Sequence, residues 1–168
     1  MRMSQVLRQL QAEQSSTGRR PGLMERFADF LPITEDTPRL GLGEGFTPLV
    51  HARRLGRAIG VPALHLKVEG QSPTGSFKDR FAALAISHMR ANRQHTCLAT
   101  SSGNTGAALA SYCAAANLRC RIAVVETAPL AKLQQMMACG AEIQRVRRFG
   151  TDANTTLQVF QQLQAKAQ

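Results

Sequence analysis

Two short segments of this chain combine glycines, small polar residues and a lysine in patterns that could do chemistry. In the first, residues 69–80, Gly75 and Ser76 precede Lys78. Gly75 permits a sharp backbone turn, and Ser76 is suited to cap a helix that places Lys78 in its first turn. The positive end of a helix disfavours an ammonium, so a lysine held there is suited to act as a nucleophilic amine that forms a Schiff base. The alternative is an exposed lysine whose stem carries its charge into water.

The second segment, residues 100–106, reads Thr-Ser-Ser-Gly-Asn-Thr-Gly after a short apolar run. Small residues and glycines at the start of a helix expose several backbone N–H groups, which suits a carboxylate or a phosphate. The alternative is a tight turn in which Ser102 or Asn104 caps the helix. We expect both segments to follow strands of one parallel sheet and to meet at its carboxyl edge, where ligands bind. A nucleophilic lysine beside an anion site would suit an amino-acid substrate.

The elements that must position these segments follow from hydrophobic periodicity. Strands are predicted over 64–68, 97–100, 121–125 and 142–146, and helices over 78–90, 104–116, 130–138 and 152–164. Strands that alternate with helices indicate a parallel sheet with helices on its faces, so the fold class is α/β. Before this region we expect a polar helix over 5–14, helical spacing over 23–31 and a loop over 33–48.

Composition narrows the function classes. The chain has 168 residues, of which 43% are apolar, and no apolar run is long enough to span a membrane. The net charge of +10 is spread over short basic groups, and the chain has no Trp and one Tyr. A solvated basic surface is therefore favoured over nucleic-acid binding, which would need a stacking platform.

The four cysteines show no metal-ligand spacing. There is no C-x-x-C pair and no suitable spacing to the four histidines, so neither a metal site nor a disulfide framework is predicted. Cys97 and Cys113 lie in apolar segments, which is typical of buried free thiols. Such cysteine use, and an N-terminus without a secretory pattern, favour a reducing compartment, the cytoplasm.

The two segments together resemble pyridoxal-phosphate enzymes of the tryptophan-synthase-β fold type, and within them the threonine synthases. The resemblance rests on residues 75–80, Gly-Ser-Phe-Lys-Asp-Arg, and residues 101–106, Ser-Ser-Gly-Asn-Thr-Gly. Residues 43–49 are similar to the family's opening motif, and residues 66–74 to the stretch before its lysine. The Asn-Thr-Gly sequence favours threonine synthase over threonine dehydratase or cysteine synthase, whereas the cysteate synthases are harder to separate.

The resemblance implies a role for each matching residue. Lys78 would hold pyridoxal 5'-phosphate, Asn104 would hydrogen-bond its ring hydroxyl oxygen, and Phe77 would also contact it. The substrate would be a phosphorylated amino acid, O-phosphohomoserine, converted with water to threonine and phosphate. The substrate carboxylate would be bound by Ser101, Ser102, Gly103 and Thr105. The substrate phosphate would be bound by Thr47 and Lys67.

The resemblance also implies an incomplete fold. The family's glycine-rich loop for the cofactor phosphate and the residue facing the pyridine nitrogen come later in longer chains, and nothing after Gly106 resembles them. We therefore expect a truncated, partial three-layer open parallel sheet, with a helical extension over 1–40 and an incomplete enzyme domain over 41–168. Activity would need a homo-oligomer or a partner chain that supplies the remaining half. The alternatives are another lyase or synthase of this fold and a non-catalytic interaction module.

One position departs from the family pattern. Phe81 stands where the family has glycine after Asp-Arg. We expect a ring at this position to crowd the helix packing beside the cofactor.

Overall fold

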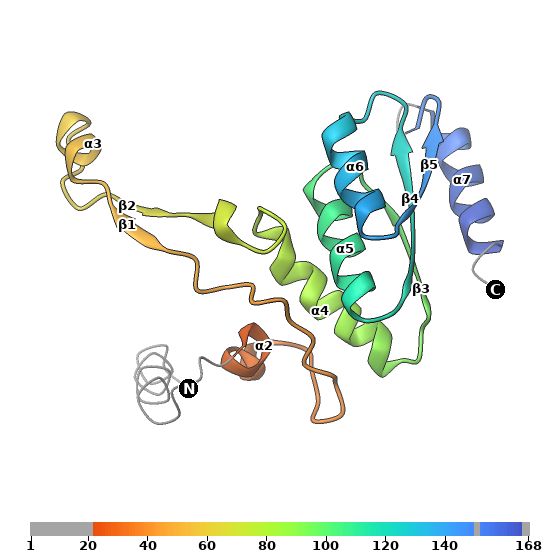
Figure 1. Cartoon of the computed structure of the whole chain (residues 1–168), viewed down its shortest axis with the longest axis horizontal. Helices are drawn as coiled ribbons and strands as arrows, with labels where there is room; N and C mark the ends of the chain where they lie inside the picture. The colour runs from red at the N-terminus through yellow and green to blue at the C-terminus, as the bar shows by residue number, and fades with distance from the viewer. Residues whose placement is uncertain (1–21, 150–151, 166–168) are drawn as a thin grey trace.

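A computed structural model describes residues 22–149 and 152–165. The helix predicted over 5–14, and with it half of the extension over 1–40, lies outside the described residues. The described chain forms a three-layered body and an extended arm that projects from it (Figure 1). Within the described ranges, no helix combines the length and apolar character that a membrane crossing requires.

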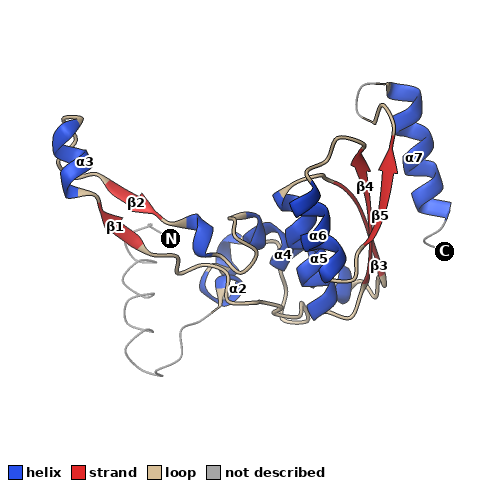
Figure 2. Ribbon diagram, turned by 45° about the horizontal axis from the view of Figure 1, so that its top comes forward, coloured by secondary structure: helices blue, strands red, loops and turns tan. Residues whose placement is uncertain are grey.

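The body is built on a three-stranded parallel sheet in the order β3-β4-β5. The strands β3 (Thr96–Thr100), β4 (Arg119–Val125) and β5 (Glu142–Val146) are in register, with Ala99 opposite Ile122 and Ile122 opposite Ile143. Figure 2 shows α5 (Asn104–Ala115) and α6 (Leu130–Ala138) on one face of the sheet and α7 (Ala153–Ala165) on the other. The predicted α/β class with a layered parallel sheet is confirmed.

The core lies between the sheet and the helices α4 (Lys78–Ala91), α5 (Asn104–Ala115) and α6 (Leu130–Ala138). Alanine side chains on α5 let it pack closely between α4 and α6. The largest fully buried apolar side chains are Tyr112, Ile86, Ile122, Met136 and Val124. On the opposite face, Val159 and Leu163 of α7 cover Ala123 of β4.

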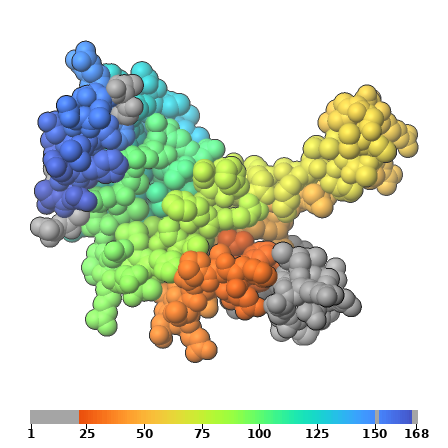
Figure 3. Space-filling view, turned by 180° about the vertical axis from the view of Figure 1, so that it is seen from behind, coloured from red at the N-terminus to blue at the C-terminus, as the bar shows by residue number. Residues whose placement is uncertain are grey.

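The arm is a two-stranded antiparallel hairpin that carries a short helix at its tip. Its strands β1 (Leu49–His51) and β2 (His65–Lys67) pair with Val50 opposite Leu66, and α3 (Arg53–Ala58) lies between them. The strand predicted over 64–68 therefore exists, but its expected place in the parallel sheet is wrong. Figure 3 shows, from behind, that the arm stands away from the body.

The segment before the arm is less regular than its spacing predicts. The helical pattern over 23–31 divides into α2 (Leu23–Arg26) and the 3-10 turn η1 (Ala28–Phe30). A second 3-10 turn, η2 (Glu69–Gln71), joins β2 to the lysine segment. Met24 of α2 is buried in the main core, so this segment is fixed to the body by packing.

Candidate functional site

Lys78 is the first residue of α4, as its position after Gly75 predicts. The predicted capping role of Ser76 is wrong: the cap residue is Phe77, and no side chain caps the helix within the described residues. The Ser76 hydroxyl instead accepts a 3.4 Å hydrogen bond from the Lys78 backbone N–H. Gly75 has a φ of +85°, a left-handed conformation that glycine adopts without steric cost.

The lysine loop, residues 72–79, is closed by a buried carboxylate. Asp79 is fully buried, and its Oδ2 accepts a 2.8 Å hydrogen bond from the backbone N–H of Thr74. The Thr74 hydroxyl donates to Oδ1 of the same carboxylate. Gly75 N–H donates to the Ser72 carbonyl at 2.8 Å. These bonds fix the backbone that carries Lys78, because a buried carboxylate must be satisfied by donors.

The lysine side chain is half-buried beside an exposed ring. Its Nζ lies 4.9 Å from the centroid of the Phe77 ring, within cation–π range. Phe77 is 55% exposed, so this ring is open to a ligand. Phe81 is 53% exposed and lies outside the buried face of α4. Its ring does not crowd the helix packing among the described residues, and its effect on the packing beside the cofactor stays a prediction.

The serine loop, residues 101–103, follows β3 directly. The Ser101 hydroxyl accepts hydrogen bonds from the N–H groups of Gly103 at 3.3 Å and Gly106 at 3.0 Å. Gly103 is the cap residue of α5, and neither Ser102 nor Asn104 caps the helix in the described chain. Asn104 is exposed and Thr105 is half-buried, so their side chains lie at the surface of the loop.

The two loops meet through α6 and not through a shared sheet edge. Gln135 Nε2 donates a 3.1 Å hydrogen bond to the carbonyl oxygen of Thr74 in the lysine loop. The next residue, Met136, packs on the start of α5: a Cβ added to Gly106 would lie 2.7 Å from its Cε. Adjacent residues of α6 therefore contact both segments that the sequence singles out.

A basic cavity of about 460 Å³ lies beside the lysine loop. Both residues predicted to contact a phosphate line it, since Thr47 and Lys67 are neighbours and Lys67 Nζ donates to the Thr47 carbonyl. Its polar and charged lining consists of Arg26, Thr47, Lys67 and Arg80. Sequence reasoning missed Arg26, since the helical spacing over 23–31 gives this residue no role at the site.

The two arginines that line this cavity differ in whether their N–H donors are already used in hydrogen bonds. Arg80 forms a two-pronged pair with Glu69, with Nη2 to Oε1 at 3.0 Å. The hydrogen bond from Arg80 holds the pKa of Glu69 below its usual value, although burial opposes this shift. Arg26 Nε is buried and finds no hydrogen-bond partner among the described residues. Of the two arginines that line this cavity in the described chain, Arg26 therefore has the free N–H donor, while its guanidinium stacks on the Phe46 ring with 4.9 Å from Cζ to the centroid.

The chain belongs to the family of pyridoxal-phosphate dependent enzymes, because the sequence profile of that family matches residues 40–168. Among curated relatives, the threonine synthase of Halalkalibacterium halodurans is 43% identical over 127 residues, which are 75% of this chain and 36% of the relative. That of Mycobacterium tuberculosis is 40% identical over 124 residues, which are 73% and 34% of the two chains. The chain thus spans about a third of these relatives.

Solved structures with the same fold include two racemases. A pyridoxal 5'-phosphate-dependent aspartate racemase is 30% identical, with a TM-score of 0.58 over 70% of this chain and 37% of that one. Serine racemase from Dictyostelium discoideum is 28% identical, with a TM-score of 0.63 over 72% and 38% of the two chains. These comparisons confirm the family and the fold that the two motifs predict.

Proposed function

We propose that Lys78 is the residue that holds pyridoxal 5'-phosphate covalently. The fit rests on its half-buried amine at the start of α4 and on a loop backbone fixed by Asp79. The exposed ring of Phe77 offers a face to the cofactor ring, and Asn104 offers a side-chain donor at the surface of the serine loop. When bound, the cofactor supplies an electron sink for carbanion chemistry.

We assign the serine loop to the substrate carboxylate. Ser101, Ser102, Gly103 and Thr105 are proposed to bind it. The loop lies at the start of α5, where backbone N–H groups and the helix dipole favour an anion. The Ser101 hydroxyl orders this turn by accepting from Gly103 and Gly106. The helix α6 contacts both the serine loop and the lysine loop. A carboxylate bound at the serine loop would therefore leave the rest of the amino acid directed towards the lysine loop.

The reaction we propose is that of threonine synthase, in which O-phosphohomoserine and water give threonine and phosphate. The observation that carries this choice is the cavity in which Arg26, Thr47, Lys67 and Arg80 lie together. Arg26 Nε is buried without a partner among the described residues, which is costly unless an acceptor binds there. A phosphate oxygen would satisfy this donor, and Lys67 would add a second positive charge.

The activity is proposed to require the rest of the fold, supplied by a partner chain or a second copy. The curated relatives extend well beyond the region that this chain matches. The arm supports this inference, because both strands are exposed throughout, with Leu49 64% and Leu66 44% accessible. Exposed apolar surface of this kind marks an interaction site. We propose that the missing half packs on the arm.

There are two alternative functions: another enzyme with the same cofactor chemistry, and an interaction module without catalytic activity. Another lyase or synthase of this fold would keep Lys78 and the serine loop but would not need the phosphate cavity. A non-catalytic interaction module would need only the arm. The solved relatives with this fold include enzymes named as racemases and a threonine deaminase, so the fold alone does not choose the substrate.

The cofactor assignment is tested by titrating the purified chain with pyridoxal phosphate and recording the visible absorption of the lysine-bound cofactor. We expect a saturable band that Lys78→Arg abolishes. Lys132→Arg is the control, because it also replaces an amine with a guanidinium in a helix of the body and keeps an N–H donor for Gln135, to which Lys132 Nζ donates at 3.1 Å. A saturable band that survives in Lys78→Arg would overturn the assignment, whereas Lys132→Arg should keep the band.

The substrate assignment is tested by calorimetry with O-phosphohomoserine and with homoserine. We expect the phosphorylated compound to bind more tightly, and Arg26→Gln and Lys67→Gln to reduce this preference by about 10-fold or more, as expected for loss of a charged hydrogen bond. Arg54→Gln, on the exposed surface of α3, is the control for net charge. Equal binding of both compounds would favour a different lyase of this fold.

A further inference from the structure

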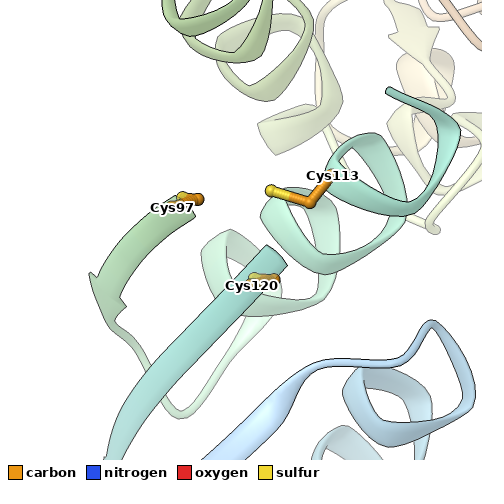
Figure 4. Close-up of side chains that lie close together, drawn as sticks. All are labelled: Cys97, Cys113 and Cys120. Carbon is orange, nitrogen blue, oxygen red and sulfur yellow. The ribbon is translucent and has the colours of Figure 1, made fainter. Parts of the chain in front are cut away.

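Three cysteines from separate elements meet inside the body. Cys97 lies on β3, Cys113 on α5 and Cys120 on β4, and their Sγ atoms all lie within 4.8 Å of one another. All three are buried, with exposures of 5%, 0% and 4%. Figure 4 shows the Cys113 side chain directed from the helix towards the two strands. We call this group the thiol cluster.

Strand register is what assembles the thiol cluster. Cys97 and Cys120 are paired residues of neighbouring parallel strands, so their side chains lie on the same face of the sheet. Cys113 is on the helix that covers this face. The spacing in sequence gives no hint of this arrangement, which explains why no metal site is predicted from the sequence alone.

We propose that Cys97, Cys113 and Cys120 form a binding site for a thiophilic divalent cation of the Zn²⁺ class. Thiolate sulfurs bind Zn²⁺ at about 2.3 Å, so three ligands around one ion lie about 4 Å apart, which the observed separation accommodates. Three protein ligands leave one coordination position open for water or another ligand. Soft sulfur ligands exclude Mg²⁺ and Ca²⁺, which prefer oxygen.

A cavity of about 730 Å³ lies near the thiol cluster and is separate from the lysine loop. Its lining includes Thr96, Ala114 and Arg119, each next in sequence to one member of the cluster, but none of the three thiols. It lies at the amino end of β3, whereas the serine loop follows the carboxyl end of this strand. Cys139, which also lines the cavity, is 3.3 Å from the Ser111 hydroxyl and is not a member of the thiol cluster.

The net charge of the thiol cluster with a bound metal ion is compatible with its position in the body. Each metal–sulfur bond that forms replaces one S–H bond, and the proton passes to solvent without oxidation or reduction. A divalent ion with three thiolates carries one net negative charge. Arg119 lines the nearby cavity, so a positively charged side chain lies in the same region of the body.

The test uses the reduced full chain and Cd²⁺, whose bonds to thiolates give an ultraviolet charge-transfer band. We expect one Cd²⁺ per chain and three Cd–S bonds. Cys97→Ala and Cys120→Ala should each weaken binding by at least the ~10–100-fold that loss of an outer-shell partner costs a metal site. Cys139→Ala is the control and should bind as the parent chain does, since its thiol is outside the thiol cluster.

A second measurement uses the unaltered chain, so its result does not depend on whether the cysteine variants fold. The cadmium NMR chemical shift distinguishes three sulfur ligands from one or two. A shift typical of three sulfur ligands supports the proposal. No stoichiometric uptake, or a loss of binding in Cys139→Ala equal to that in Cys97→Ala, would show that the thiol cluster is only apolar core packing. The measurement needs neither pyridoxal phosphate nor Lys78, so its outcome is independent of the proposed function.

Discussion

Gln135 donates a hydrogen bond of 3.1 Å to the carbonyl oxygen of Thr74, and this bond ties the middle of α6 to the lysine loop. The two residues are far apart in sequence, so the bond depends on the packed body. Its acceptor precedes Gly75, where the chain takes its left-handed turn before α4. The bond thus supports the backbone conformation that brings Lys78 to the start of the helix.

Gln135→Leu is expected to loosen the lysine loop more than it destabilises the body. The free energy of unfolding should fall by about 1 kcal/mol, the usual net value of one hydrogen bond. Hydrogen exchange of the peptide over 72–79 should accelerate relative to β4. The control is Gln134→Leu, the exposed neighbour on the same helix. Equal exchange in both variants would show that the Thr74 carbonyl does not need this partner.

Much of the body could be predicted because its pattern is local. The predicted helix over 130–138 and strand over 142–146 match α6 and β5 at both ends. The helix has a periodic apolar face, and Gly140, with a φ of +79°, separates it from the strand. The loop motifs around Lys78 and Ser101 were also visible, since glycine and small polar residues mark turns at helix starts.

The features that could not be predicted from the sequence depend on contacts between distant segments. The strand β1 has three exposed residues and becomes a strand only by pairing with β2, so its own sequence carries no burial pattern. Arg26 reaches the cavity of Lys67 because Met24 fixes its segment to the core. The thiol cluster depends on the register of β3 and β4. Tertiary packing sets each of these features, and sequence spacing does not.

Tyr112→Phe is expected to destabilise the chain by about 1.5–3 kcal/mol, the range for hydrogen bonds to charged groups. The Tyr112 hydroxyl donates to Oε2 of Glu44, a carboxylate that is only 4% exposed. The Leu42 backbone N–H also donates to this oxygen, at 2.9 Å. Burial, with the nearby Glu44, raises the pKa of Tyr112, so the phenol remains protonated. Urea unfolding measures the change.

A double-mutant cycle with Glu44→Gln separates the hydrogen bond from the loss of a buried oxygen. If the bond carries the effect, adding Glu44→Gln to Tyr112→Phe should cost less than Glu44→Gln costs alone. Additive effects would mean that the two side chains do not interact energetically.

The Glu69–Arg80 pair predicts how stability responds to acid. The pKa of Glu69 in the folded chain is below the ordinary value of 4.5, chiefly because Arg80 hydrogen-bonds its carboxylate. Between the folded pKa and 4.5 the unfolded chain binds more protons, so acidification through this window favours unfolding. The contribution is complete above pH 4.5 and is lost as the pH falls through the folded pKa.

Glu69→Gln should therefore flatten the decline of stability below pH 4.5. At neutral pH it should cost at most about 1 kcal/mol, because the pair is partly exposed and screened. Arg80→Gln should flatten the same window, since it removes the cause of the shift. Thermal unfolding between acid and neutral pH is the measurement, and an unchanged acid slope in both variants would contradict the assignment to this pair.

Gly106→Ala is expected to destabilise the chain although alanine favours helices. The gain in helix propensity is about 0.8–1 kcal/mol. Against it, the new Cβ would lie 2.6 Å from the backbone oxygen of Ser101 and 2.7 Å from Met136 Cε. The oxygen is part of the serine loop and cannot move alone, so overpacking should cost about 1–3 kcal/mol and displace this loop. Gly103→Ala is the control for added volume, because its Cβ meets nothing within 4 Å, and the only expected cost is that of alanine at the cap position. Denaturant unfolding of the two variants should show that Gly106→Ala is the less stable. If both variants unfold alike, the close packing of α6 against the start of α5 does not require a glycine at position 106.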